Sequence, residues 1–295
     1  MIASPDRLRN RGTMLLEALE HWLTPCPRPW RELGYLHEQI AIDARLRRNH
    51  DAWAPHLQAT RRAILDAAEL CARPKTALLL GAGIHHDVPL VELASRFERV
   101  LLADLVHRPR VRRRAAAISA RIACVEFDVT GILGDLMAHG RAWNEEEMVE
   151  RVRHAPIGLP PGAGEEPDLV VSANLCAQLM LLPYDWLARQ RPTTDDLAEQ
   201  LERAAAERHL EWLRQRRGVS LLISETERRQ VSPTGEVLDR ERVPGLGQLG
   251  VADRKWLWRV APIPEASRAY HREHLVGTWY LRGGPRRGGA SGTPW

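Results

Sequence analysis

The stretch TALLLGAGIHHDVPL, residues 76–90, decides how the rest of the chain is interpreted. Its apolar run Ala77–Leu80 has the composition of a buried parallel strand. The run ends in Gly81-Ala82-Gly83, and glycine there permits positive φ and close approach of a ligand to the backbone. A short Gly-x-Gly is weak by itself, so the residues that follow decide its meaning.

Polar residues follow this run and later apolar runs at points that favour nucleotide binding. The run Val100–Ala103 ends at Asp104, about 20 residues beyond the glycine turn, where dinucleotide-binding folds place the carboxylate that accepts hydrogen bonds from ribose hydroxyls. Two further apolar runs end near Asp128 and Asn174. Because ligands bind outside the carboxyl ends of parallel strands, these side chains are expected at one ligand site.

From Leu70 to Leu281 the chain resembles the class I S-adenosylmethionine-dependent methyltransferases. The motifs that carry the resemblance are Leu78–Gly83, Leu101–Asp104, Val125–Asp128 and Leu169–Asn174. Two aromatic-rich strands, Trp256–Val260 and His274–Leu281, have no helix between them and are expected to pair antiparallel. The resemblance implies an α/β fold with a three-layer Rossmann-like sheet, seven-stranded and mostly parallel with an antiparallel C-terminal strand, plus an N-terminal helical extension.

The resemblance also implies a cofactor, S-adenosylmethionine, and roles for single residues. The glycine turn would lie against the methionine and ribose part, Asp104 would hold the ribose hydroxyls, and Asp128 with Val129 would meet the adenine. The strand end from Ser172 to Asn174 would face the sulfonium and the acceptor. The residues expected to contact the cofactor are Gly81, Ala82, Gly83, Asp87, Asp104, Leu105, Asp128, Val129 and Ser172.

The chain departs from the family pattern at the glycine turn. Leu79 stands where the family usually has an acid, and His85 stands where it usually has a third glycine. Asp87 is a candidate to replace the acid, and it also suits a helix start, where a carboxylate interacts with the dipole. The fourth motif lacks the Asp/Asn-Pro-Pro-Tyr/Phe form of enzymes that methylate the exocyclic amines of bases, which argues against that acceptor.

Three residues are candidates for catalysis. His85 and His86 are placed beside the expected cofactor, where an imidazole can act as a general base near neutral pH. The alternative is that they only fill or cap the turn. Asn174 is expected to hydrogen-bond substrate or cofactor, or to satisfy loop backbone as a buried amide. No metal site is expected, because His271 and His274 lack a third ligand at matching spacing.

Composition limits the function classes. The chain has 295 residues, a net charge of +4 and four scattered cysteines, which suits reduced thiols in a cytosolic protein. We expect a cytoplasmic location and no membrane span. A small-molecule acceptor is expected, with RNA or a protein left open. The expected division is an N-terminal helical extension or lid at 1–70, a methyltransferase-like domain at 71–281 and a flexible tail at 282–295. Helical spacing predicts helices over residues 5–24 and 31–70, with a break near Pro55, and a fifth strand is expected over residues 219–224.

Two other functions remain open. A non-catalytic protein that uses the methyltransferase fold for binding or as a scaffold would show an altered first motif. An NAD(P)-dependent oxidoreductase would share the glycine turn and the ribose acid. It would be expected to keep Gly-x-Gly-x-x-Gly, whereas the third position here is His86, and the chain has no Tyr-x-x-x-Lys pair.

Overall fold

The computed structural model describes residues 22–72, 74–164, 166–194 and 196–284. Most of the helix expected over residues 5–24, and most of the tail at 282–295, lies outside these residues. The strands are β1 (Thr76–Leu80), β2 (Arg99–Asp104), β3 (Ile122–Glu126), β4 (Leu169–Ala173), β5 (Val219–Val231), β6 (Val237–Arg242), β7 (Arg254–Ala261) and β8 (His271–Arg282). The helices are α2 (Arg28–Glu32), α3 (Tyr35–Arg48), α4 (His50–Glu69), α5 (Leu90–Arg96), α6 (Pro109–Ile118), α7 (Leu133–His139), α8 (Glu145–Arg153), the 3₁₀ turn η1 (Cys176–Gln178), α9 (Leu181–Gln190) and α10 (Leu197–Arg214).

The sheet has the strand order β3-β2-β1-β4-β5-β8-β7, and β6 pairs with β5 beside this path. Strands β1 to β5 run parallel to one another, and β8 runs antiparallel to both β5 and β7. This confirms a Rossmann-like α/β fold with a mostly parallel sheet and an antiparallel C-terminal strand. The strand order reverses between β1 and β4, and such a switch point opens a crevice for ligands at the carboxyl ends of the strands.

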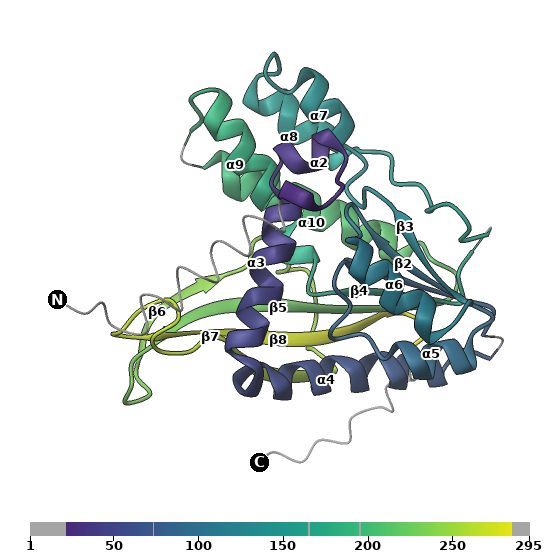
Figure 1. The fold of residues 1–295 in the computed structure, drawn as a ribbon. Coiled ribbons are helices and arrows are strands. Elements are labelled where there is room, and N and C mark those ends of the chain that lie inside the picture. Colours follow the sequence, from purple (N-terminus) through teal and green to yellow (C-terminus); the bar gives the residue numbers. More distant parts are fainter. Residues whose placement is uncertain (1–21, 73, 165, 195, 285–295) are drawn as a thin grey trace.

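Alternating side chains of the strands pack against two helical layers. Leu79 belongs to the core formed with α4, α5 and α6, whereas Leu78 and Leu80 belong to the core formed with α10. This period of two is what a strand buried on both faces requires. A third core joins α3 to α7, α8, α9 and α10. Figure 1 shows α4 and α5 along one face of the sheet, with α3 rising from α4 toward α7, α8 and α9, which contribute to the third core.

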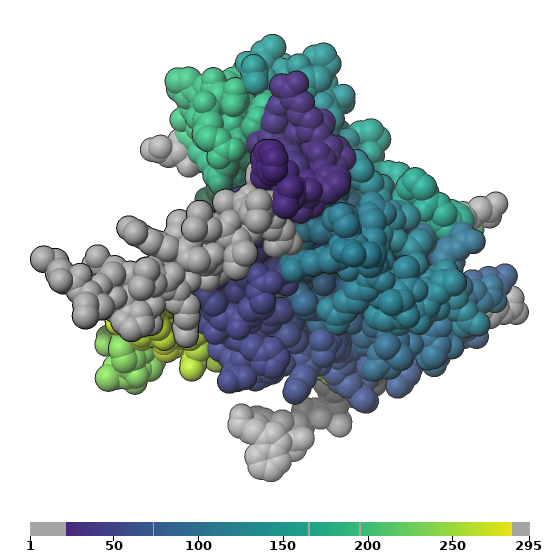
Figure 2. Space-filling view, in the orientation of Figure 1, coloured from purple at the N-terminus to yellow at the C-terminus, as the bar shows by residue number. Residues whose placement is uncertain are grey.

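Helices α2 and α3 lie on the side of the molecule where the carboxyl ends of the parallel strands are. In the space-filling view, the purple surface of α2 meets the green surface of α9 and the teal surface of α7 and α8 (Figure 2). Leu33, Leu36 and Ile40 are buried in the same cluster as residues of α7 and α9. The chain before β1 therefore contributes both to the sheet packing, through α4, and to the covering of the strand ends, through α3.

Two details differ from the sequence expectations. Strand β5 was expected to end at Ser224 but continues to Val231, and the polar region after it contains an eighth strand, β6. The extension of β5 is stabilised by backbone pairing on both sides and by cross-strand contacts such as Arg228 with Glu241. Because charged pairs take the place of apolar residues, the sequence there lacks the apolar pattern from which strands were predicted. A helix break was expected near Pro55, but α4 continues through Pro55 and the break lies at Asn49. A proline in the second turn of a helix removes only one helical hydrogen bond, so the helix can continue past it.

Gly218 offers a test of how tightly β4 and β5 pack. A Cβ added at Gly218 would overlap the carbonyl oxygens of Pro167 and Asp168, which belong to backbone and cannot rotate away. We expect Gly218→Ala to lower the free energy of unfolding by about 3 kcal/mol, measured by urea denaturation. Gly247→Ala, where an added Cβ meets nothing within 4 Å, should change it by less than about 0.5 kcal/mol. Equal effects of the two substitutions would contradict the packing described.

Candidate functional site

A cavity of about 420 Å³ lies at the carboxyl ends of β1, β2 and β4 and at the start of the loop after β3. It is at the switch point between β1 and β4, and its volume is within the roughly 300–1,000 Å³ range of ligand pockets. Its lining includes Gly81, Gly83, Asp104, Asp128 and Asn174. The fold therefore brings together polar residues from strand ends that are far apart in the sequence.

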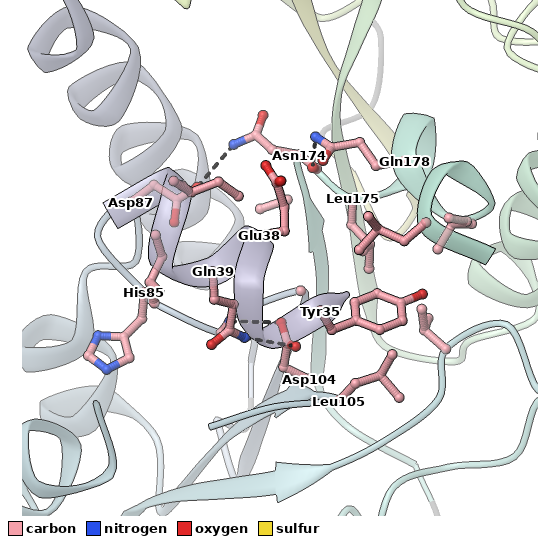
Figure 3. Close-up of a pocket in the computed structure, with 18 of the residues that line it drawn as sticks. Tyr35, Glu38, Gln39, His85, Asp87, Asp104, Leu105, Asn174, Leu175 and Gln178 are labelled. Atoms are coloured by element: carbon pink, nitrogen blue, oxygen red, sulfur yellow. Dashed lines mark hydrogen bonds between the residues drawn. The ribbon is translucent and has the colours of Figure 1, made fainter. Parts of the chain in front are cut away.

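Helix α3 forms a wall along the length of this cavity. Tyr35, Glu38, Gln39, Ile42 and Leu46 line it, and their spacing of three and four residues places them on one helical face. From Tyr35 to Leu46 this face extends about 16 Å at 1.5 Å per residue. Figure 3 shows Tyr35, Glu38 and Gln39 directed from α3 toward the residues of the strand ends.

At one end of the cavity, Asp104 joins the glycine turn to α3. Its Oδ2 accepts a hydrogen bond from the backbone N–H of Gly83 at 2.9 Å, and its Oδ1 accepts from the amide of Gln39 at 3.3 Å and from the N–H of Val106 at 3.3 Å. A Cβ at Gly83 would overlap both side chains, so glycine is needed for this close approach. Burial raises the pKa of Asp104, while His107 opposes this rise.

The loop after β3 completes this end of the cavity. The Asp128 carboxylate accepts hydrogen bonds from the N–H and hydroxyl of Thr130 and from the N–H of Leu133, so it fixes the turn that leads into α7. Val129 and Leu105 add apolar surface beside it. The Tyr35 hydroxyl lies near both acids, and burial together with their charges raises its pKa. We call this region, with Tyr35, Gln39, Asp104, Leu105 and Asp128, the strand end of the cavity.

The middle of the cavity contains Asn174, Asp87 and Glu38. Asn174 donates from Nδ2 to Asp87 Oδ2 at 3.0 Å, and burial raises the pKa of Asp87 although this bond opposes the rise. Asn174 has φ of +54°, and His85 has φ of +41°. Positive φ is unfavourable for residues with a Cβ, and such strain is found preferentially at functional sites. Figure 3 shows the Glu38 carboxylate directed toward Asn174.

His56 lies next to this pair and is a hydrogen-bond donor rather than a base. Its Nδ1 accepts from the indole N–H of Trp256 at 3.0 Å, so the single proton of the neutral ring is on Nε2, 3.3 Å from the Asn174 amide. Burial, with the charge of His274, lowers the pKa of His56 to about 3. Exchange of the nitrogen and oxygen of the Asn174 amide would give Nε2–H an acceptor and would require a proton on Asp87. The raised pKa of Asp87 suits that arrangement.

The other end of the cavity is aromatic. Trp53, His56 and Trp258 line it together with Leu46 and Leu57, and we call this set the aromatic end. The His56 ring stacks on Trp258 with centroids 4.0 Å apart and planes at 8°, and Trp53 meets Trp258 edge to face at 4.9 Å. The Nε1–H of Trp258 is buried with no hydrogen-bond partner in the described part of the chain.

The acidic side chains in the cavity lining are not balanced by basic ones. Five carboxyl groups line it, from Glu38, Asp87, Asp104, Asp128 and Asp185. No lysine or arginine is found among the described lining residues. The site is therefore suited to a neutral or cationic ligand, and it offers no side-chain cation to a phosphate.

His85 and His86 border the cavity but hydrogen-bond to protein groups. Nε2 of His85 lies 3.4 Å from the carbonyl oxygen of Val111, and Figure 3 shows its ring extending away from Asp87 and Asn174. His86 contacts Asp43 at 2.9 Å, and Asp43 also pairs with Arg108 at 3.1 Å. Burial lowers the pKa of both imidazoles to about 4. Their role in catalysis stays a prediction.

Two of the other expected residues do not line the cavity. Ala82 is buried in the core on the α4 side of the sheet. The Ser172 hydroxyl lies 2.9 Å from Nε2 of His209 on α10, and neither side chain is exposed. The other expected residues all line it, namely Gly81, Gly83, His85, His86, Asp87, Asp104, Leu105, Asp128, Val129 and Asn174.

Several cavity residues were not anticipated from the sequence. Glu38 and Gln39 are on α3 and His56 is on α4, whereas Trp258 lies in the aromatic-rich strand that was expected, now β7. The contact of Trp256 with His56 joins residues 200 positions apart, and no local pattern signals such a pair. The one usable signal was the helical spacing of residues 31–70, which predicted a helical segment without indicating which face meets the strand ends.

Other kinds of site have less support. Within the described ranges, no group of three His, Cys, Asp or Glu side chains is arranged to hold a metal ion. His271 pairs with Glu273 at 3.2 Å, whereas His274 contacts the buried Glu225 at 3.9 Å. The helices among the described residues are too short or too polar to cross a membrane.

Comparison with known proteins gives no family assignment. No protein-family model matches the chain, and no curated protein matches it. Among solved structures, the chain is similar to a precorrin 8W decarboxylase from Methanobacterium thermoautotrophicum, with 13% identity over 74% of this chain and 88% of that chain and a TM-score of 0.25. We draw no conclusion about function from a likeness at this level.

The buried His209 gives a pH-dependent prediction. Burial lowers its pKa from 6.5 to about 4, so its stabilising contribution is complete above pH 6.5 and is lost as the pH falls from 6.5 toward 4. His209→Gln keeps a polar group beside Ser172 but removes this titration. We expect the difference in unfolding free energy between wild type and variant to shrink by about 2 kcal/mol from pH 7 to pH 5. A difference independent of pH would show that His209 is not buried as described.

Proposed function

We propose that this protein is an S-adenosylmethionine-dependent methyltransferase of the class I family that acts on a small-molecule acceptor. The observation that carries the proposal is the cavity at the switch point of the sheet, which is lined by carboxyl groups and by no lysine or arginine among its described residues. S-adenosylmethionine has a sulfonium and an ammonium group and no phosphate. Its charge therefore complements this lining.

The same observation weighs against an NAD(P)-dependent oxidoreductase. A dinucleotide has a pyrophosphate, which proteins hold with helix N-termini, glycine-rich backbone and basic side chains. Helix α5 begins at Leu90, seven residues after Gly83, and the intervening segment presents His85 and His86 at the cavity. Five carboxyl groups in the lining would repel the phosphates.

The residues present fit the proposed cofactor in two regions, the ribose and the adenine. Asp104 would hold the ribose hydroxyls at the strand end, and Leu105 and Val129 would cover the adenine. Most acceptor sites of the Asp104 carboxylate are already used by Gly83, Val106 and Gln39. Binding of both hydroxyls would therefore require the Gln39 amide to move aside, which links cofactor binding to α3.

The chemistry needs positioning more than covalent assistance. When bound, S-adenosylmethionine supplies a methyl group that is already activated by the sulfonium. The chain would exclude water through α3, hold the acceptor in line, and take up a proton where the acceptor carries one. Glu38 is the carboxyl group in the middle of the cavity for that proton, whereas Nδ1 of His56 is already occupied by the indole N–H of Trp256.

Calorimetric titration with S-adenosylmethionine and S-adenosylhomocysteine tests the proposal. We expect binding of both by wild type, and a loss of at least about tenfold in affinity for Asp104→Asn, because the amide has no charge and one acceptor oxygen where the carboxylate has two. Asp51→Asn makes the same charge change at a fully exposed side chain and should leave the affinity unaltered. Melting temperatures are recorded for each variant, since Asp104 also binds backbone.

Three outcomes separate the alternatives. Folded protein that binds neither compound would refute the methyltransferase proposal. The protein is also incubated with S-adenosylmethionine and a cell extract, and mass spectrometry is used to look for compounds that have gained CH₂. Binding of the cofactor without any such gain would favour the non-catalytic binding or scaffold function. Binding of NADH with no affinity for S-adenosylhomocysteine would favour the oxidoreductase.

A further inference from the structure

The aromatic end of the cavity has a composition that the cofactor does not explain. Trp53 and Trp258 are at least nine-tenths buried, and His56 is 2% exposed, yet all three line the same cavity as Asp104. Flat side chains around a cavity favour a flat ligand, because aromatic rings stack or meet edge to face at 4.5–7 Å.

The charge next to the aromatic end comes from Glu38. Its carboxylate has no hydrogen bond or ion pair recorded within the described residues, and Figure 3 shows it directed into the middle of the cavity. With no lysine or arginine in the described lining, an anionic ligand would meet repulsion without compensation. A cationic group would gain an ion pair in a partly dehydrated site.

Helix geometry relates the carboxylate to the aromatic end. Glu38 precedes Ile42 by one turn and Leu46 by two turns on the same face of α3, which corresponds to about 6 Å and about 12 Å along the axis. A ring between Ile42 and Trp258 would therefore be separated from Glu38 by about 6 Å along the helix axis. A side chain of two or three atoms that ends in an amino group has this length.

We propose that the aromatic end binds the methyl acceptor and that the acceptor is a small arylalkylamine, with its ring beside Trp53 and Trp258 and its ammonium group at Glu38. This assignment of an acceptor rests on the proposed methyltransferase function. In the transfer, the ammonium gives one proton to the Glu38 carboxylate, and the freed nitrogen lone pair forms the bond to the methyl carbon. The carbon–sulfur bond breaks with its electron pair on sulfur, which leaves a neutral thioether and a methylated ammonium.

Three probes separate ring from charge. 2-Phenylethylamine has ring and cation, 3-phenylpropionate has the ring with an anion, and hexylamine has the cation without a ring. In calorimetry with saturating S-adenosylhomocysteine, we expect 2-phenylethylamine to bind at least about tenfold more tightly than either of the others. Equal or tighter binding of 3-phenylpropionate or hexylamine, or no binding of any probe to protein that binds S-adenosylhomocysteine, would overturn the proposal.

Paired variants locate the charge preference. Glu38→Gln should weaken 2-phenylethylamine by about tenfold and leave 3-phenylpropionate no weaker, whereas Glu32→Gln, which removes an exposed acid paired with Arg28, should change neither. If Glu38→Gln still preferred 2-phenylethylamine over 3-phenylpropionate as strongly as wild type does, the proposal would be refuted. A loss confined to S-adenosylhomocysteine binding would also refute it, because Glu38 would then belong to the cofactor site. The titrations are repeated without S-adenosylhomocysteine. Amine binding by protein that fails to bind the cofactor product would support the amine site while refuting the methyltransferase function.

Discussion

The contact of Asp104 with Gly83 and Gln39 is the constraint on which the site depends. It joins the end of β2, the turn after β1 and the wall helix α3 through one carboxylate, and a Cβ at Gly83 would overlap the Gln39 and Asp104 side chains in this arrangement. Two further contacts attach α3 to the same region, because the Gln39 amide also donates to the carbonyl oxygen of Val106 at 2.7 Å and Asp43 pairs with Arg108 at 3.1 Å. Together these contacts hold the wall that carries Tyr35 and Glu38.

Starting from this contact, the chemical character of the cavity lining changes along its length in a way that suits two ligands, a cofactor and an acceptor. The strand end offers acids and small apolar side chains, the middle offers Glu38, Asp87 and Asn174, and the aromatic end offers stacked rings. Carboxyl groups prevail throughout, so ligand charge is the property that the lining selects most strongly. The strained backbone at Asn174, held by its N–H bond to Ile223 at 2.8 Å, places the amide at the boundary between the two proposed ligands.

The strands and their polar ends could be predicted because their signals are local. An apolar run, a glycine turn and an acid at fixed spacing determined β1, β2 and the position of Asp104. The α3 wall and the contact of Trp256 with His56 depend on contacts between distant segments, which periodicity does not encode. The extension of β5 was missed because paired charges replace apolar residues there. Ser172 was expected at the ligand but is turned toward His209, since alternate residues of a strand face opposite sides.

The most direct test of the central claim is a crystal structure grown with S-adenosylhomocysteine. The account predicts the ribose hydroxyls at Asp104, the adenine beside Leu105 and Val129, and the Gln39 amide displaced from its present contact with Asp104 at 3.3 Å. The amino-acid part should extend toward Asp87 and Asn174, with Glu38 and the aromatic end left open. Ligand bound elsewhere, or bound in this cavity with its adenine among Trp53, His56 and Trp258, would contradict the account.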